Sequence, residues 1–149
     1  MEIKKYINHD SICFFRDEKS KKVILESMIK MISASGLIPD EEEFKKAIFE
    51  REKILSTGIG FGIAIPHAKL SSISDFTIGI GISKQGIDYG SLDEKKVYII
   101  VMIAGPTGRQ KDYLSLLSRV LLVLKNVEVR DKILACKKEE QIFEIFTKY

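Results

Sequence analysis

The sequence predicts an α/β fold, in which residues 1–149 form a single domain with a mixed parallel and antiparallel sheet flanked by helices. A chain of 149 residues is long enough to bury about two-thirds of its unfolded surface. Segments with helical apolar spacing are interleaved with short apolar runs, a pattern typical of α/β proteins. Residues 76–104 carry strand patterns with no helix between them, so the sheet is expected to be mixed.

Local signals place the individual elements. Ser20 or Asp17 can cap the first helix, and Asp40 and Glu43 have the spacing of a capping box at the start of the second. The expected elements, in chain order, are a strand at Ile12–Phe15, a helix at Lys19–Ser35, a helix from Asp40, a short strand at Ile63–Ile65, strands at Phe76–Ser83 and Val97–Ala104, and helices at Lys111–Lys125, Val129–Ala135 and Glu139–Thr147.

The second helix carries a charge on its apolar face. Phe44, Ala47 and Ile48 define that face, and the same spacing continues to Arg51. Because an unpaired buried charge is costly, the guanidinium needs a partner. The alternative is an arginine that extends to solvent at the helix end or caps its last carbonyls.

The two long strand patterns differ in kind. Residues 76–83 alternate, with isoleucine on one face and Gly or Thr on the other, so something must approach the open face closely, such as the backbone of the glycine-rich stretch. Residues 97–104 are continuously apolar, which predicts a central strand buried on both faces. In the late helix, the expected apolar face consists of Leu114, Leu117, Leu121 and Leu124, with Val120 beside them.

A glycine-rich stretch, residues 56–67, holds the strongest candidate for a functional side chain. Gly58, Gly60 and Gly62 allow tight turns and close approach, and Pro66 ends the short strand that follows. His67 is therefore expected at a strand end beside a glycine loop. It either performs chemistry or is a histidine at the edge of the core that is bonded to the backbone.

Composition and failed motifs exclude several function classes. The net charge is +3 without a basic arm, which gives no indication of nucleic-acid binding, and an apolar run of eight residues is too short for a membrane helix. The single cysteines Cys13 and Cys136 fit a reducing cytoplasm. Nucleotide-binding loops, a serine-hydrolase elbow and a zinc site each lack required residues: Ile65 and Gln110 replace glycines, and His9 and His67 lack zinc spacing.

Three segments together resemble a known family. They are Arg51-Glu52-Lys53, Ser56-Thr57-Gly58 and Gly62-Ile63-Ala64-Ile65-Pro66-His67. The sequence is similar here to enzyme IIA of the fructose–mannitol type in the bacterial phosphotransferase system, a family that includes the nitrogen-regulatory IIA proteins. The likeness covers nearly the whole chain, and it implies the family fold of a mixed sheet flanked by helices.

The resemblance implies that His67 accepts a phosphoryl group from a small HPr-like phosphocarrier protein and passes it on. The family arginine matches Arg51. A neutral imidazole can act as a nucleophile near pH 7, and a guanidinium can bind phosphoryl oxygens with two donors. The Thr57 hydroxyl and the N–H groups near Gly58, Gly60 and Gly62 are further candidates for phosphate contacts. Because the nucleophile belongs to the protein, no metal or other cofactor is expected.

The chain departs from the family at Tyr113. Many members carry a second histidine there, at the start of the late helix. A tyrosine can donate one hydrogen bond to a phosphate oxygen but is not a cation near neutral pH. Arg109 and Lys111 lie just upstream and either compensate for the missing histidine or are solvated loop charges.

Two functions remain open. The chain is either a carrier that hands its phosphoryl group to a IIB domain or a regulatory protein whose phosphorylation state switches binding to a target. Both need an apolar docking patch near His67, for which Ile59, Phe61 and Leu70 are candidates. In either case the chain is a component of a phosphotransferase system rather than a stand-alone enzyme, and it is expected to act in the cytoplasm.

Overall fold

A computed structural model describes residues 1–18 and 20–149. Lys19, at which the first helix was predicted to begin, lies outside the described residues. In chain order the elements are two 3-10 turns, Ile3–Lys5 and His9–Ser11, then β1 (Ile12–Phe15), α1 (Lys21–Ser33), α2 (Glu41–Ile54), β2 (Gly58–Gly60), β3 (Ile63–Ala64), β4 (His67–Leu70), β5 (Thr77–Ile87), β6 (Val97–Pro106), α3 (Gln110–Lys125), α4 (Val127–Ala135) and α5 (Glu139–Phe146).

The sheet is mixed, as predicted. Its strand order is β1-β5-β6-β3-β2, and β4 also pairs with β6. β5 runs antiparallel to β6 and β2 antiparallel to β3, whereas β1 is parallel to β5, and β3 and β4 are parallel to β6. β6 is therefore central: β5 covers one of its edges, and β3 and then β4 share the other. This confirms the prediction for residues 97–104.

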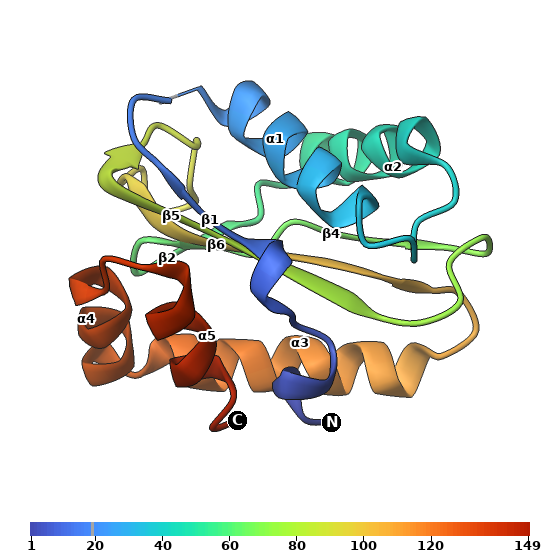
Figure 1. The fold of residues 1–149 in the computed structure, drawn as a ribbon. Helices are drawn as coiled ribbons and strands as arrows, with labels where there is room; N and C mark the ends of the chain where they lie inside the picture. The colour runs from blue at the N-terminus through green and yellow to red at the C-terminus, as the bar shows by residue number, and fades with distance from the viewer. Residues whose placement is uncertain (19) are drawn as a thin grey trace.

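Helices cover both faces of the sheet (Figure 1). α1 and α2 pack on one face, and α3, α4 and α5 pack on the other, so the domain has three layers with two apolar cores. The caps of the first two helices follow the sequence signals. Ser20, rather than Asp17, accepts the bond from Val23 N, and Asp40 accepts one from Glu43 N at 3.1 Å.

The open face of β5 is covered by a helix rather than by the glycine-rich stretch, which corrects the prediction. Ile78, Ile80 and Ile82 face the core beneath α3 to α5. On the opposite face, a Cβ at Gly79 would lie 2.7 Å from Ile32 Cγ1, a side chain of α1. The glycines thus let α1 lie unusually close to the sheet.

This close packing predicts a large stability effect at Gly81. An added Cβ would lie 2.6 Å from the Phe15 ring and 2.9 Å from Met28 Sδ. We expect Gly81→Ala to lower the free energy of unfolding by about 2–3 kcal/mol, because overpacking forces neighbouring side chains off their preferred geometry. Urea-induced unfolding measures this. A midpoint and slope equal to those of the wild type would contradict the packing described for this face.

The buried face of α3 also differs from the prediction. Its buried side chains are Tyr113, Leu116, Val120, Val123 and Leu124, whereas Leu114 is 52% exposed and Leu117 and Leu121 are half-buried. The core stripe is rotated by about one residue from the predicted leucine stripe. The rotation turns Tyr113 inward, toward β4 and the site described below.

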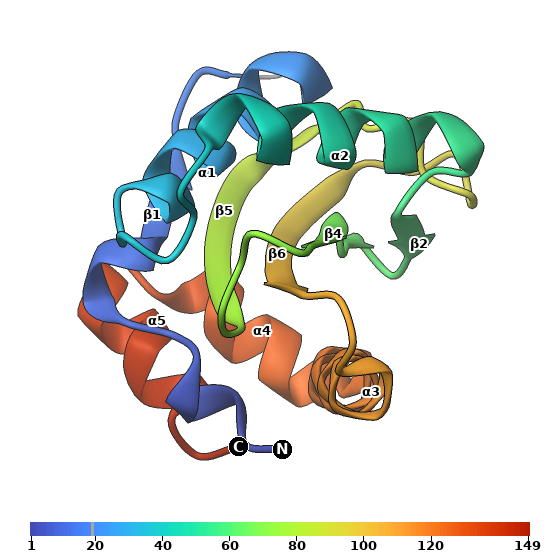
Figure 2. The same cartoon turned by 90° about the vertical axis from the view of Figure 1, so that its right-hand side faces the viewer.

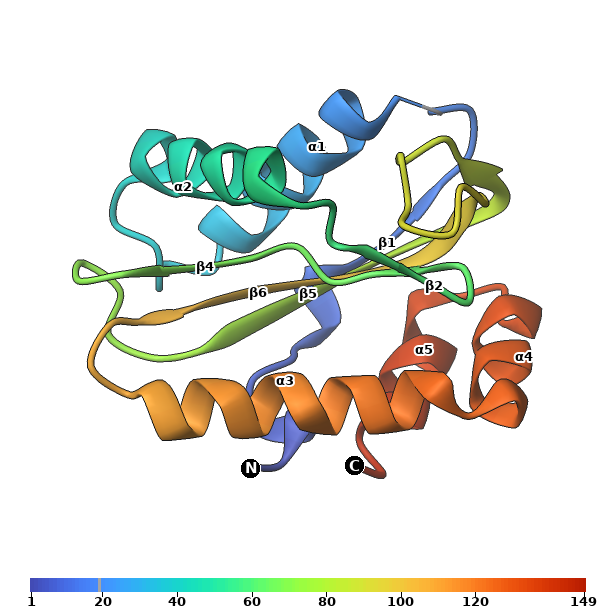
Figure 3. The same cartoon turned by 180° about the vertical axis from the view of Figure 1, so that it is seen from behind.

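β4 lies at the sheet edge, between the α2 layer and the α3 layer (Figures 2 and 3). Side chains of β4, the end of α2 and the start of α3 can therefore meet at this edge. Among the helices of the described residues, none combines the length and the apolar character required to cross a membrane.

Candidate functional site

His67 is held at the beginning of a strand. It is the first residue of β4 and pairs in parallel with Ile103 of β6. β3 ends at Ala64, and Pro66, which has no N–H, separates the two strands while its carbonyl accepts a bond from Ile103 N at 3.0 Å. The predicted strand is thus one residue shorter, and His67 begins the strand after it instead of ending it.

The imidazole is fixed in one tautomer. His67 Nδ1 lies 2.7 Å from the carbonyl oxygen of Ile65. Because a carbonyl oxygen can only accept, Nδ1 must carry the hydrogen, and in the neutral ring the lone pair is then on Nε2. His67 is thus bonded to the backbone, as one of the two sequence-based interpretations predicted. This bond uses only Nδ1, so Nε2 is still available for chemistry.

His67 is expected to be neutral near pH 7. Burial lowers its pKa below the ordinary value, and the positive charge of Arg51 lowers it further, while the bond to Ile65 acts in the opposite direction. The net effect is a lowered pKa. A half-buried histidine with a free lone pair at neutral pH has the properties of a nucleophile.

A pH titration tests this electrostatic description. The His67 imidazole should titrate below the ordinary pKa of about 6.5, as followed by NMR, and Arg51→Ala should raise its pKa because a nearby positive charge is lost. Because the pKa of His67 is lower in the folded protein, the unfolded chain binds this proton more tightly at a pH near or below about 6.5. The free energy of unfolding should therefore fall as the pH drops below about 6.5. A His67 pKa above 6.5, or one that Arg51→Ala leaves unchanged, would contradict the description.

Arg51 lies in the last turn of α2, close enough to influence the His67 charge. Its Nη1 donates to the Leu55 carbonyl at 2.8 Å. Arg51 thus caps a carbonyl at the end of α2, which is one of the alternatives that the sequence left open. Since a guanidinium carries five N–H donors, capping by Nη1 is compatible with a second role toward His67.

Tyr113 reaches the same place from α3. Its ring centroid lies 5.8 Å from that of His67. The side chain is 3% exposed, and its hydroxyl is buried without a hydrogen-bond partner among the described residues. A buried hydroxyl without a partner costs free energy, so the Tyr113 hydroxyl is a candidate donor to a group bound at this site.

Lys69 is a neighbour that sequence reasoning missed. It lies two residues after His67, on the same face of β4, because side chains alternate along a strand. Its Nζ lies 5.0 Å from the centre of the Tyr113 ring and donates to Gln110 Oε1. The two-residue spacing from His67 was the available signal. Lys69 adds positive charge to the site, and that charge also lowers the pKa of His67.

Thr57 belongs to a buried polar cluster next to this site. Its hydroxyl donates to Glu52 Oε1 and lies 2.9 Å from the Tyr89 hydroxyl. Glu52 also pairs with Lys21 Nζ at 2.8 Å. The hydroxyl is thus engaged inside the protein. The sequence singled out Glu52 only as part of the Arg51-Glu52-Lys53 segment and assigned it no role, although Glu52 continues the Phe44–Ile48 helix face by four residues, where the prediction placed Arg51.

The glycines do not all lie near His67. Gly62 O accepts bonds from Tyr98 N and Ile99 N, whereas His67 pairs with Ile103. Five residues of β6 separate Tyr98 from Ile103, about 16 Å along a strand. Gly60 lies at the same hairpin tip, and Gly58 N is engaged by Ser56 Oγ at 3.1 Å. Gly60 and Gly62 are therefore remote from His67, and the Gly58 N–H is already engaged.

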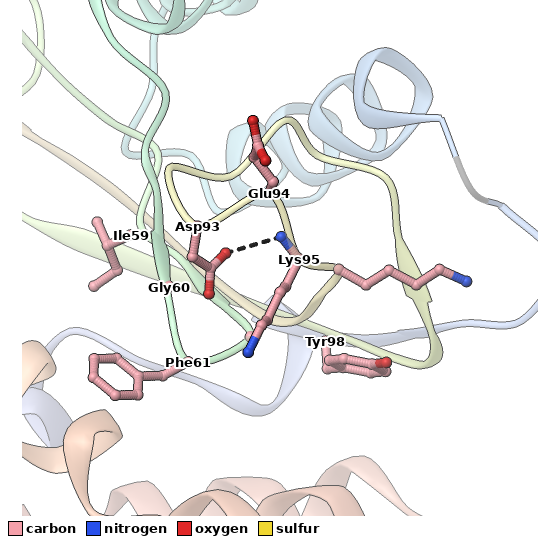
Figure 4. Close-up of a pocket in the computed structure, with 9 residues that line it drawn as sticks. Ile59, Gly60, Phe61, Asp93, Glu94, Lys95 and Tyr98 are labelled. Carbon is pink, nitrogen blue, oxygen red and sulfur yellow. Dashed lines mark hydrogen bonds between the residues drawn. The ribbon is translucent and has the colours of Figure 1, made fainter.

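The hairpin tip has its own hollow of about 810 Å³. Figure 4 shows the residues lining it: Ile59, Gly60, Phe61, Gly62, Asp93, Glu94, Lys95, Lys96 and Tyr98. Of the candidate docking residues, Phe61 is 62% exposed at this tip, away from His67, and Leu70 packs against the α1–α2 core. Exposed apolar side chains close in sequence to the site residues are Ile54 and Leu55 at the end of α2 and Leu114 on α3.

The two upstream cations differ in environment. Arg109 pairs with Asp75 and Asp112, each at 3.0 Å, and its guanidinium lies 4.8 Å from the centre of the Phe76 ring. These partners hold the loop before α3 in place. Lys111 is exposed on the first turn of α3. The positive charges that act on His67 are thus those of Arg51 and Lys69 rather than Arg109, and the negative charge of Glu52 acts in the opposite direction.

The fold is that of known IIA proteins. A crystal structure of the nitrogen regulatory protein IIA-Ntr from Neisseria meningitidis superposes with a TM-score of 0.90 at 22% identity, covering 97% of this chain and 99% of that one. A complex of enzyme IIAMTL with phosphorylated enzyme IIBMTL from Escherichia coli matches with a TM-score of 0.74 at 16% identity, over 95% and 97% of the two chains.

Sequence comparison shows the family. Residues 5–149 match the model of the phosphoenolpyruvate-dependent sugar phosphotransferase system, EIIA 2, and the chain belongs to this family. The fructose-specific EIIABC component of Bacillus subtilis (strain 168) is 35% identical over 149 residues. That alignment covers all of this chain but 24% of the relative, so the chain spans about a quarter of that protein's length.

Proposed function

We propose that the chain is a phosphohistidine carrier, in which His67 Nε2 accepts a phosphoryl group from an HPr-like phosphocarrier protein. One observation supports this most strongly. The Tyr113 ring lies 5.8 Å, centre to centre, from an imidazole whose Nδ1 is engaged by Ile65 O, and the buried Tyr113 hydroxyl lacks a partner among the described residues. A phosphoryl group on Nε2 would supply the acceptor that this hydroxyl lacks.

The transfer needs little chemistry beyond positioning. The Nε2 lone pair attacks phosphorus, and the bond between phosphorus and the donor atom of the carrier breaks in line, with its electron pair returning to that atom. Arg51 donates to the equatorial oxygens with its remaining N–H groups, and Tyr113 donates one more bond. Lys69 adds positive charge close by. All of these groups belong to the chain itself.

The docking surface for the phosphocarrier consists of the apolar side chains next to the site. Leu55 and Leu114 are 55% and 52% exposed, and they follow or adjoin residues that contact or influence His67. An apolar patch around a charged centre is common in protein interfaces. We propose this patch in place of Ile59, Phe61 and Leu70.

After phosphorylation, the group passes to a IIB partner in the cytoplasm. The fold is shared with a IIA protein solved in complex with a phosphorylated IIB. Regulation of a target protein by the phosphorylation state is the second candidate, because the fold is also shared with a nitrogen regulatory protein. A phosphoryl group that leaves His67 only when a IIB domain is added supports the first candidate, and a target bound in one phosphorylation state supports the second.

An intact-mass assay tests the proposal. The protein is mixed with phosphoenolpyruvate, the general enzyme of the system and its phosphocarrier, all from the same organism. We expect an acid-labile gain of one phosphoryl group that is absent in His67→Ala. Unphosphorylated wild-type protein, with the fold intact and the phosphocarrier phosphorylated, would contradict the proposal, and so would a gain that persists in His67→Ala.

A further inference from the structure

Glu52 places a buried carboxylate next to Arg51 in the last turn of α2. Glu52 is the residue after Arg51, and its side chain is 5% exposed. Its carboxylate accepts from four donors: Lys21 Nζ at 2.8 Å, Thr57 N at 3.3 Å, Tyr89 OH at 2.9 Å, and the Thr57 hydroxyl. Burial raises the pKa of Glu52, but these donors outweigh it and the net pKa is lowered, so the group is charged.

Hydrogen bonds connect this carboxylate to His67. Glu52 holds the backbone N–H and the hydroxyl of Thr57. The Thr57 carbonyl accepts from Ile65 N at 3.0 Å, and the Ile65 carbonyl holds His67 Nδ1 at 2.7 Å. The path therefore runs from the end of α2, through Thr57 and Ile65, to the imidazole ring.

The same carboxylate also fixes the position of Arg51. Arg51 and Glu52 are consecutive in the last turn of α2, where Arg51 caps the Leu55 carbonyl. Lys21 at the start of α1 and Tyr89 after β5 anchor Glu52 from two other parts of the chain. Lys21 Nζ also lies 4.4 Å from the centre of the Tyr89 ring. A carboxylate held on several sides can keep α2 in a fixed place relative to β4.

We propose that Glu52 is a positioning residue for phosphoryl transfer, which holds Arg51 and the Nδ1–H tautomer of His67 in register through Thr57 and Ile65. The proposal rests on the proposed function, because it assigns Glu52 a role in that reaction. Glu52 acts through other residues and contacts neither the phosphoryl group nor the donor. In-line transfer is sensitive to small displacements, and a shift of about 1 Å can cost two orders of magnitude in rate.

Glu52→Gln is the informative change. The two hydroxyls contact Oε1, and Lys21 Nζ and Thr57 N contact Oε2, so a glutamine can keep these contacts only by reversing the direction of both hydroxyl bonds. The change also removes the negative charge that pairs with Lys21. Glu26→Gln is the matched control. Glu26 on α1 pairs with Lys45 on α2 at 3.0 Å, so this change also removes a carboxylate that links α1 to α2.

Two readouts test the proposal. At saturating phosphocarrier, Glu52→Gln should slow transfer to His67 about tenfold or more, with the KM for the carrier within about twofold of wild type, because the docking surface is untouched. Glu26→Gln should keep the wild-type rate. In the unphosphorylated protein, ¹⁵N NMR of the His67 ring should show a smaller Nδ1–H population in Glu52→Gln.

Tyr89→Phe provides a milder variant should Glu52→Gln fail to fold. It removes one donor to the carboxylate and keeps the ring, and we expect transfer to slow about threefold. Folded Glu52→Gln and Tyr89→Phe proteins with wild-type rates and unchanged His67 ring signals would overturn the proposal. An equal loss in Glu26→Gln would overturn it as well. The NMR readout needs no phosphorylation, so it decides on positioning even if His67 accepts no phosphoryl group.

Discussion

Replacement of Arg51 by alanine should slow phosphorylation of His67 about a hundredfold. The positive charge of Arg51 lowers the pKa of His67, and its guanidinium can donate two parallel bonds to the equatorial oxygens of the transferring group. Loss of one preorganised donor to a developing negative charge typically costs about 10²–10³ in rate. The measurement is the single-turnover rate of phosphoryl gain with excess phosphorylated carrier.

Arg51→Lys separates charge from geometry. An ammonium keeps the positive charge but lacks the planar pair of donors, so we expect a rate between those of Arg51→Ala and wild type. Neither change should unfold the protein, because the one hydrogen bond to Leu55 O contributes about 1 kcal/mol. If Arg51→Ala is phosphorylated as fast as wild type, the arginine serves only to cap α2.

Replacement of Tyr113 by phenylalanine should have opposite effects on stability and on transfer. The hydroxyl is buried and lacks a partner in the described residues, so its removal should raise the free energy of unfolding of the unphosphorylated protein by about 1 kcal/mol. The same change removes a donor to the phosphoryl group. A hydrogen bond to a charged group contributes about 1.5–3 kcal/mol, so transfer should slow at least tenfold.

Thermal or urea unfolding gives the first effect, and the transfer rate gives the second. Phenylalanine keeps the ring that contacts His67, so the packing of this ring should be the same in the wild type and the variant. Any difference between them then comes from the hydroxyl. A less stable variant with an unchanged transfer rate would mean that the hydroxyl already has a partner in the resting protein and none in the phosphorylated state. This result would remove Tyr113 from the site.

The sequence predicted the strands β1, β3, β5 and β6, because their apolar patterns are local, but it missed the short strands β2 and β4. The continuous apolar run at residues 97–104 can be satisfied only by burial on both faces, and it is the central strand β6. The alternation at residues 76–83 correctly separated two faces of β5. What covers the glycine face depends on packing between distant segments, and α1 rather than the glycine-rich stretch lies there.

The helical faces were harder to predict. α3 carries apolar residues over much of its circumference, so leucine spacing alone does not locate the centre of the buried stripe, and Tyr113 rather than Leu114 faces inward. In α2, spacings of three and four residues from Ile48 reach Arg51 and Glu52, respectively. The structure buries Glu52, because Lys21 supplies an opposite charge and Tyr89 donates a hydrogen bond from elsewhere in the chain.

The site shows the same division. The glycine-rich motif singled out His67, helix periodicity singled out Arg51, and the family resemblance alone pointed to Tyr113. The fold brings all three to one edge of the sheet. Gly60 and Gly62 were grouped with His67 because they are close in sequence. The extended chain from β3 to β4 carries them about 16 Å away along β6.

The most direct test of the central claim is ¹H–¹⁵N NMR of the histidine rings before and after phosphorylation. The chain has two histidines, His9 and His67, so each ring can be assigned with one substitution. The account predicts that phosphorylation changes the His67 ring alone, with phosphorus on Nε2 and the hydrogen still on Nδ1, bonded to Ile65 O. Phosphorus on Nδ1, on His9 or on any other residue would contradict it.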